Sequence, residues 1–471
     1  MVQFVCYTSS LEPKKVEDAL KDEYWIKTMQ EELEQFERNE IFKNKTDESG
    51  NITRNKARLV AQGYTQVEGV DFDETFAPVA RLESIRLLIS VASVLQLKLH
   101  QMDVKSEFLN GYLSEEVYVE QPKGFSDPKY PDHVYRLSKA LYGLKQAPRA
   151  WYEWLSKFLC STGFIRGGVD KTLFIKKKEQ ELTIAQIYVD DIIFGSTSEH
   201  EVKRFVRDMQ GEFEMSMMGE LAYFLGFQVK QKEDGIFISQ KKNAKNLVKK
   251  FDLEGSKAMR TPMSTTAYVT KDEEEIPADA TMYRSMIGSL QYLTASRPDI
   301  SYSVGVCARY QSAPRESHVK LARRILRYVK GTVNWGLWFS RDSNTILAGY
   351  SDADWAGNVD DRKSTSGGCF YLSNNLLIWM SQMLADYGIS SGALIVYCDN
   401  TSAINISKNL VQYSRTKHID IRHHFIRDLV EDGKVMLNHI STDKQLADIF
   451  TKSVDVKRFE FLRGAFGLCC I

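Results

Sequence analysis

The sequence lacks the features that mark zinc-binding, disulfide-rich and membrane-spanning proteins. Its seven cysteines form no CxxC pair and no Cys/His spacing typical of zinc, and only Cys469 and Cys470 are neighbours. No window approaches about 20 uninterrupted apolar residues, and the N-terminal stretch has no apolar core with a cleavage site. We therefore expect a soluble intracellular protein, cytoplasmic or nuclear, with no signal peptide and no transmembrane segment.

The chain also has no net charge, because 62 basic residues balance 62 acidic ones. A polyanionic partner would have to be bound by local basic patches. The 471 residues are 43% apolar and 26% charged, which is ordinary for globular proteins and sufficient for about two to four domains. Internal repeats and long low-complexity tracts are absent from the sequence.

What the sequence does contain is a series of amphipathic segments. Residues 14–36 and 80–97 have apolar residues at helical spacing, and the second of these precedes "KLHQMDV" (98–104), which alternates as a strand does. Residues 182–195, "LTIAQIYVDDIIFG", predict a hairpin of two apolar strands with Asp190 and Asp191 at or next to its tip.

Two adjacent aspartates at a hairpin tip repel one another unless a cation neutralises them. Magnesium is the natural partner, because it is a hard ion that binds carboxylates and substrate phosphates. Two such ions can activate a 3'-hydroxyl and stabilise a leaving pyrophosphate, and Asp103, at the end of the alternating strand, is the candidate third ligand. The alternative is a simple turn, in which Asp is favoured for local hydrogen bonding.

Two later segments leave similar alternatives open. In "GYSDADWAG" (349–357), Asp352 and Asp354 would project from one face of a strand, as half of a metal site or as a solvated strand end. Residues 315–330 form a helical pattern whose basic face is either simply solvated or contacts a nucleic-acid backbone. After residue 346, strands interleave with late helices, which indicates a compact α/β domain.

The chain resembles the reverse transcriptase and ribonuclease H portion of a copia-type LTR retrotransposon Pol polyprotein. The resemblance is carried, in collinear order, by "NKARLVAQGYTQVEGVDFDETFAPVARLESIRLL", "QMDVKSEFLNGYLSEEVYVEQPKGF", "LYGLKQAPRAWY", "YVDDIIFG", "YFLGFQV", "YRSMIGSLQYLTASRPDI", "SDADWAGNVDDRKSTSG", "YCDN" and "SRTKHIDIRHHFIRDLV". It implies an α+β polymerase of fingers, palm and thumb, followed by an α/β ribonuclease H-like domain. The implied divisions are fingers and palm at 14–235, thumb and connection at 236–343, and the ribonuclease H-like domain at 344–455.

The resemblance also assigns roles to residues of the polymerase. Asp103, Asp190 and Asp191 would bind two catalytic Mg²⁺ ions, and Gln146 would line the sugar of the incoming nucleotide. Phe108 matches the position that blocks a ribose 2'-hydroxyl, with core packing as an equally weighted alternative role. Lys56 and Arg58 resemble the finger cations that meet the triphosphate. The implied partners are an RNA template, a DNA primer, the RNA–DNA hybrid and deoxynucleoside triphosphates.

The ribonuclease H part of the resemblance is incomplete. Asp352, Asp399 and Asp448 match three of the four carboxylates around two Mg²⁺ ions, whereas Asp354 is expected to be a neighbour. The Glu that should be the fourth ligand is missing, together with the strand and helix expected near residues 373–385. The one acid between Arg362 and Cys398 is Asp386, whose "MLADYG" context differs from the acidic helix of the family. We therefore expect ribonuclease H activity to be lost.

A second departure concerns the fingers, where residues 41–50 replace a longer stretch that includes a finger strand in the family. The histidines His418, His423, His424 and His439 are interpreted as helix-surface or hydrogen-bonded residues rather than zinc ligands. Three hypotheses follow: an RNA-directed DNA polymerase with a degenerate nuclease domain, a non-catalytic nucleic-acid-binding relic, or a chain from which real coding sequence was removed as introns.

Overall fold

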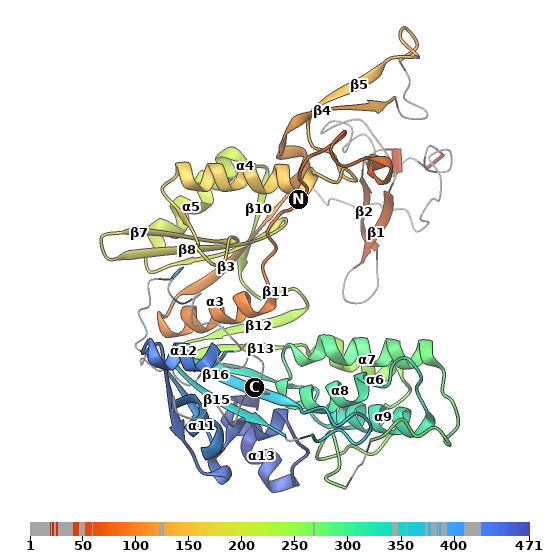
Figure 1. Cartoon of the computed structure of the whole chain (residues 1–471). Helices are drawn as coiled ribbons and strands as arrows, with labels where there is room; N and C mark the ends of the chain where they lie inside the picture. The colour runs from red at the N-terminus through yellow and green to blue at the C-terminus, as the bar shows by residue number, and fades with distance from the viewer. Residues whose placement is uncertain are drawn as a thin grey trace, which may run out of the picture.

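The computed structural model describes residues 19, 21–22, 25–26, 41–46, 52–58, 60–121, 127–266, 269–341, 347–354, 356–372, 375–377, 384, 386–387, 393–408 and 425–471. These residues form three sheets of five or six strands, two separate hairpins and helices packed between and around them (Figure 1). The helix predicted over residues 14–36 lies almost entirely outside the described residues. No helix in the described part of the chain is both long and apolar enough to cross a membrane.

The first sheet is antiparallel, with the strand order β10-β3-β9-β8-β7-β6. Its strands are β3 (Lys98–Val104), β6 (Ile165–Arg166), β7 (Leu173–Lys178), β8 (Glu181–Tyr188), β9 (Asp191–Ser196) and β10 (Met215–Glu220). The strand predicted over residues 98–104 and the hairpin predicted over 182–195 are both confirmed. Apolar, β-branched runs that are buried on both faces explain why β8 and β9 occupy central positions.

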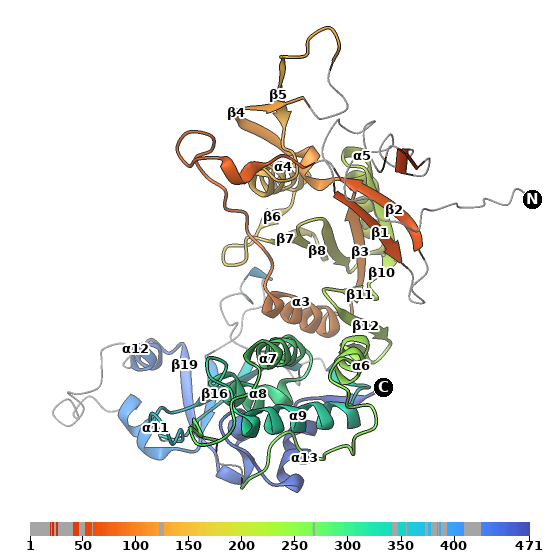
Figure 2. The ribbon, with the colours of Figure 1, turned by 90° about the vertical axis from the view of Figure 1, so that its right-hand side faces the viewer.

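Helices cover both faces of the first sheet (Figures 1 and 2). Helices α4 (Ala147–Ser161) and α5 (Glu199–Glu212) bury one apolar side against it, through Trp151, Leu155 and Phe205 among others. Helix α3 (Leu82–Val94), predicted from its spacing, packs on the opposite face together with strands of the second sheet. The sheet is therefore packed on both faces, and the hairpin turn between β8 and β9 lies at one end of its central strands.

The second sheet is also antiparallel and combines distant parts of the chain. Its order is β11 (Tyr223–Phe224), β12 (Phe227–Lys232), β13 (Gly235–Ser239), β14 (Trp335–Ser340) and β20 (Leu468–Cys470). Helices α6 (Lys241–Lys250), α7 (Ala280–Thr294), α8 (Ser301–Ala308) and α9 (Glu316–Gly331) pack beside it. Ile325 and Val329 of α9 are buried as its helical pattern predicts, whereas Leu321 is only half-buried.

The third sheet is mixed, with the order β17-β16-β15-β18-β19. Strands β15 (Leu347–Ala353), β16 (Ser366–Leu372) and β17 (Asn375–Leu377) pair antiparallel, while β18 (Leu394–Cys398) and β19 (Val435–His439) run parallel to β15. The described helices of this region are α11 (Thr401–Lys408), α12 (Phe425–Glu431) and α13 (Val456–Ala465). Short 3-10 turns complete the chain: η1 (Gly63–Thr65), η2 (Glu107–Asn110), η3 (Pro298–Ile300), η6 (Thr442–Lys444) and η7 (Leu446–Phe450).

Two described strands lie in the regions where the sequence departs from the family pattern. Strand β1 (Ile41–Thr46) pairs antiparallel with β2 (Ile52–Arg58). Residues 375–377 pair with β16, so the third sheet keeps a strand after β16. Both β1 and β17 form because a neighbouring strand offers unpaired backbone N–H and C=O groups. Amino-acid composition does not show which segment will pair with those groups.

The remaining hairpin, β4 (Tyr112–Glu120) with β5 (Val134–Lys139), projects away from the sheets in both views (Figures 1 and 2). The sheets themselves share one large apolar core. Its residues come from α3, from the helices beside the second sheet and from the third sheet, and they lie between Ala80 and Leu468 in the sequence. Side chains from all three sheets therefore contribute to one hydrophobic core.

Candidate functional site

The first acid cluster consists of Asp103, Asp190 and Asp191, which the structure brings to one end of the first sheet. Asp103 on β3 and Asp191 on β9 are direct partners in the antiparallel register of the two strands. Asp190 occupies the turn between β8 and β9, and its carbonyl oxygen accepts a hydrogen bond from the backbone N–H of Val104 at 2.9 Å. This bond ties the turn to the strand that carries Asp103.

The two-residue turn between β8 and β9 has an uncommon backbone conformation, because Val189, the residue before Asp190, has a φ of 57°. A β-branched residue rarely adopts this left-handed conformation, and doing so costs free energy that the surrounding structure must offset. The indole N–H of Trp151 on α4 donates to the carbonyl oxygen of Val189 at 2.7 Å. The packed helix therefore holds the turn in the conformation that presents Asp190 and Asp191.

The electrostatics of this cluster favour an added cation. Burial raises the pKa of the Asp191 carboxyl above its ordinary value, and the nearby charges of Asp190 and Asp103 raise it further. The side-chain amide of Gln101 opposes this shift by donating to Asp191 Oδ1 at 2.7 Å. The three carboxylates are hard oxygen donors of the kind that Mg²⁺ prefers, and their backbones lie side by side. Their oxygens do not all lie within 4.8 Å of one another, so the residue types fit the ion while the side chains are not gathered around one point.

Phe108 lies close to this cluster, in the turn η2 that follows β3. Its ring is half-buried, at 5.0 Å between centroids from the ring of Tyr142, and the Tyr142 hydroxyl donates to buried Glu107 at 2.7 Å. Phe108 also packs against two apolar clusters, one around α4 and one around Ala140–Leu144. The contacts agree with its packing role and leave part of the ring open to a ligand.

Gln146 lies immediately before α4, as its N-cap residue. Its side chain is completely buried, accepting from the amide of Gln66 at 3.1 Å and donating to the carbonyl oxygen of Asp71 at 3.3 Å. The structure therefore shows Gln146 connecting the start of α4 to residues 66–71. Lys56 and Arg58 lie on β2, and their side chains are outside the described part of the structure.

The second acid cluster consists of Asp352, Asp399 and Asp448, from β15, the residue after β18, and η7. One carboxylate oxygen from each lies within 4.8 Å of those of the other two, and this is the set of three possible metal ligands found among the described residues. Thr442 donates to Asp399 at 3.0 Å, and the amide of Gln445 donates to the same carboxylate at 3.4 Å. The tight grouping follows from parallel pairing of β15 and β18, which places their carboxyl ends side by side.

Two cationic side chains enter the second acid cluster, and the sequence analysis did not identify either. The Lys452 ammonium lies 2.7 Å from Asp448 Oδ1 and 3.6 Å from Asp352 Oδ2, and Arg458 lies 3.4 Å from Asp448. Burial opposes the charge of Lys452, but its bond to Asp448 and the charges of the three aspartates raise its pKa. The spacing of Asp448 and Lys452, four residues apart, is the signal that could have revealed the pair.

The second acid cluster does not include any of the remaining sequence candidates that the structure describes. Asp354 Oδ1 accepts from the backbone N–H of Thr365 and closes the loop between β15 and β16. Asp386 binds backbone N–H groups of residues 168–170, beside the first sheet, so it does not supply the missing fourth carboxylate. His439 is exposed at the end of β19, and His418, His423 and His424 lie outside the described residues.

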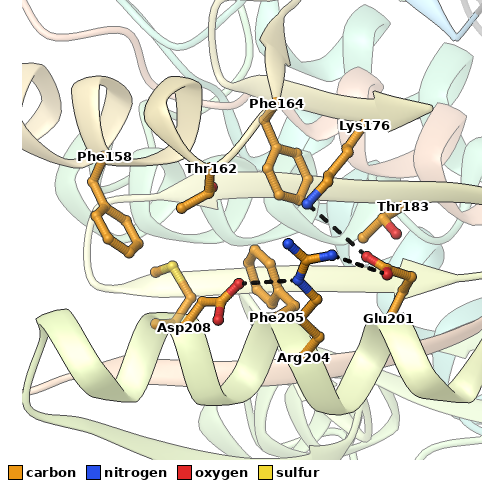
Figure 3. Close-up of a pocket in the computed structure, with 10 residues that line it drawn as sticks. Phe158, Thr162, Phe164, Lys176, Thr183, Glu201, Arg204, Phe205 and Asp208 are labelled. Atoms are coloured by element: carbon orange, nitrogen blue, oxygen red, sulfur yellow. Dashed lines mark hydrogen bonds and ion pairs between the residues drawn. The ribbon is translucent and has the colours of Figure 1, made fainter. Parts of the chain in front are cut away.

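A hollow between α4 and α5 lies apart from both acid clusters (Figure 3). Phe164 and Phe205 line it, and its interior has room for about one water molecule. Glu201, only 5% exposed, is flanked by Lys176 at 4.0 Å and Arg204 at 3.5 Å, and Arg204 also lies 3.7 Å from Asp208. The charges are thus paired with one another, which is typical of a structural ion-pair network.

Comparison with known proteins identifies relatives over the whole chain. Residues 24–265, just over half of the chain, match the family model of the reverse transcriptase (RNA-dependent DNA polymerase). The chain is 35% identical to the retrovirus-related Pol polyprotein from transposon RE2 of Arabidopsis thaliana, over 98% of this chain and 35% of that protein. It is 33% identical to the corresponding protein from transposon TNT 1-94 of Nicotiana tabacum, over 99% of this chain and 40% of that protein.

The chain thus spans about a third of the length of these relatives. The alignments extend over 515 and 526 positions, which exceeds the 471 residues of the chain, so the relatives contain internal segments that this chain lacks. Among solved structures, the foamy viral protease-reverse transcriptase in complex with dsDNA is similar at a TM-score of 0.45 and 11% identity, over 94% of this chain and 86% of that one.

Proposed function

The chain belongs to the reverse transcriptase family of copia-type retrotransposon Pol polyproteins, and from this premise we propose that it is an RNA-directed DNA polymerase. Residues 14–235 would form the fingers and palm, and residues 236–343 the thumb and connection. Residues 344–455 would form a ribonuclease H-like domain that is shortened near residues 373–385 and has lost its activity. The partners would be an RNA template, a DNA primer, their hybrid and deoxynucleoside triphosphates.

The observation that carries this proposal is the first acid cluster. The pairing of Asp103 with Asp191, and the turn that holds Asp190 beside them, bring three aspartates to the same end of a sheet that is packed on both faces. A rigid support is what nucleotidyl transfer requires, because misplacement of ligands by about 1 Å costs on the order of a hundredfold in rate.

In this proposal the three aspartates hold Mg²⁺, which when bound activates the primer 3'-hydroxyl and stabilises the leaving pyrophosphate. Gln101 opposes the rise in the pKa of Asp191 by donating to its carboxylate, and Trp151 maintains the turn through Val189. Phe108, on the turn after β3, would exclude a ribose 2'-hydroxyl by its bulk. Lys56 and Arg58 on β2 would meet the triphosphate. Gln146, which also connects the start of α4 to residues 66–71, would line the sugar of the incoming nucleotide.

The second acid cluster supports the loss of ribonuclease H activity. Asp352, Asp399 and Asp448 fit Mg²⁺ by type and distance, but Lys452 and Arg458 already neutralise two of them. Asp386, the one acid between Arg362 and Cys398, is bound elsewhere. Two-metal hydrolysis would therefore lack a carboxylate and compete with a resident ammonium group.

Primer extension on an RNA template tests the polymerase proposal. We expect Mg²⁺-dependent addition of deoxynucleotides by the wild-type protein, and loss of addition in Asp190→Asn. Asp208→Asn is the matched control. It removes the same charge from α5, a helix that packs on the same sheet away from the cluster, and the variant should extend the primer normally. Failure of folded wild-type protein to extend the primer would refute the activity.

A non-catalytic relic that binds nucleic acid is the alternative, and helix α6 is the observation in its favour. The helix exposes five lysines to solvent, and its apolar side packs on the core. The five are Lys241, Lys242, Lys245, Lys249 and Lys250. The alternative predicts hybrid binding that weakens steeply with salt, without extension, because lysines release counterions from phosphates.

A further inference from the structure

Asp386 forms a contact that crosses the molecule. Its carboxylate accepts three hydrogen bonds from consecutive backbone N–H groups, those of Gly168 at 2.9 Å and of Val169 and Asp170 at 3.0 Å each. The two segments are more than 200 residues apart in the sequence. Residues 168–170 precede β7 in the first sheet, whereas Asp386 lies between β17 and β18 of the third.

Three adjacent N–H groups directed at one point form a backbone site for an anion. The two glycines permit the close approach, because a Cβ on Gly167 would lie 3.0 Å from Asp386 Oδ2 and one on Gly168 would lie 3.2 Å from Oδ1. Hydrogen bonds to an ionised acceptor are about twice as strong as those between neutral groups. The geometry therefore favours an ionised carboxylate over an amide in this position.

Apolar burial accompanies the polar contact. Leu384 is fully buried and Tyr387 is only 3% exposed, and both belong to the large core shared by the three sheets. Burial raises the pKa of the Tyr387 phenol well above its ordinary value, and the charges of Asp170 and Asp386 add to this effect. Tyr387 thus lies beside both the loop and the carboxylate, and it enters the contact as a neutral group.

The loop that receives Asp386 is connected to the hairpin of the first acid cluster. The Asp170 carboxylate accepts from the backbone N–H of Thr172 at 2.9 Å and from the amide of Gln186 on β8 at 3.0 Å. The carbonyl oxygen of Thr172 accepts from the backbone N–H of Ile187 at 2.9 Å. Gln186 and Ile187 are the strand residues that lead to the turn containing Asp190.

We propose that Leu384, Asp386 and Tyr387 form a latch, in which the Asp386 carboxylate occupies the backbone anion site at 168–170 and fastens the region between β17 and β18 to the turn end of the β8–β9 hairpin. Through this contact, Asp386, which lies in the sequence of the ribonuclease H-like domain, stabilises the first sheet. The inference concerns coupling between two parts of the chain and does not depend on either acid cluster being active.

Amide hydrogen exchange in the full chain tests the latch. In Asp386→Asn we expect the amides of 168–170 to exchange at least about tenfold faster, the equivalent of losing one hydrogen bond to a charged acceptor. Asp386→Glu, which keeps the charge on a longer side chain, should give intermediate rates. The matched control is Asp432→Asn, which removes an exposed ion pair with Lys434 and should leave these amides unchanged.

Exchange in the wild-type protein provides a measurement that does not depend on variants. Under increasing urea, the amides of 168–170 and those of Leu384, Asp386 and Tyr387 should open in one step, with the same free energy and the same denaturant dependence. Unchanged protection of 168–170 in Asp386→Asn would overturn the latch. Separate opening of the two segments in the wild-type protein would overturn it as well, even if the variant failed to fold.

Discussion

At the scale of single residues, the proposed polymerase site depends on neighbours that control its charge. Burial is the main cause that raises the pKa of Asp191, and the hydrogen bond from the Gln101 amide opposes this rise. Asp103 and Asp191 were identified by motif, but their placement opposite one another comes from the strand register. The local sequence thus shows which residues are acidic. The pairing of the strands sets the distances between their carboxylates, and so the repulsion between their charges.

Substitution of Gln101 by Leu should move the pH dependence of nucleotide addition. Without the amide donor the pKa of Asp191 rises further, so the ionised form is lost at a higher pH as the solution is acidified. We expect the acidic limb of the rate profile to shift upward by roughly half a unit to one unit. Gln228→Leu on β12, whose amide bonds the Tyr223 hydroxyl, is the control. An acidic limb in the same place as in the wild type would contradict this role of Gln101.

Substitution of Lys452 by Met should make the second acid cluster a better cation site. The ammonium group neutralises Asp448 and Asp352, and a bound divalent ion must displace it. We expect calorimetry to show affinity for Mg²⁺ or Mn²⁺ increased by about tenfold, which corresponds to about 1.4 kcal/mol. Lys434→Met, which breaks an exposed pair with Asp432, should leave the affinity unchanged. Equal affinities in Lys452→Met and the wild type would show that the ammonium does not compete.

At the scale of elements, the structure confirms the strands and helices whose patterns are local. The strand over residues 98–104, the hairpin over 182–195 and helix α3 follow from periodicity and β-branched runs. Strands β1 and β17 were not expected. Each is stabilised by pairing with a neighbouring strand, and its own residues do not indicate which strand that is. Short strands of this kind are decided by available backbone partners.

A buried ion pair connects the helices beside the second sheet. Arg297 and Asp299 are 2.8 Å apart with side chains 2% and 1% exposed, and Arg297 also donates to Thr332 at the end of α9. Arg297→Met would leave the Asp299 carboxylate buried without its partner. We expect a loss of roughly 3 to 5 kcal/mol in the free energy of unfolding, measured in urea.

The control for this loss is an ion pair of the same type at the surface. Arg260 lies 2.9 Å from Glu460, with side chains 72% and 38% exposed, so Arg260→Met should cost less than about 1 kcal/mol. Equal losses in the two variants would mean that burial does not determine the contribution of the Arg297 pair.

At the scale of the whole molecule, the final strand closes the second sheet. Strand β20 pairs with β14, from which it is separated by about 130 residues, and α13 packs beside it. Phe459, Leu462, Phe466 and Leu468 are all buried, with at most 4% of each side chain exposed. The end of the chain therefore contributes to the same core as helix α3.

Removal of residues 456–471 should destabilise the entire chain. Each buried side chain contributes roughly 1.5 to 3 kcal/mol, so the loss is on the order of 5 kcal/mol or more, comparable with the stability of many domains. We expect a lower midpoint of thermal unfolding for regions far from the cut, including α3. Removal of Ile471 alone, 38% exposed, is the control. A truncated protein that unfolds at the wild-type temperature would refute the shared core.

The sequence by itself determined the family, the acids of both clusters and the elements with strong periodicity, because motifs and local patterns are properties of neighbouring residues. The tertiary structure decided what surrounds those acids. It placed Lys452 among Asp352 and Asp448, buried Gln146 against residues 66–71, and directed Asp386 to the loop at 168–170. These contacts join distant segments, and their energies depend on burial and on the direction of backbone N–H groups, which exist only once the chain has folded.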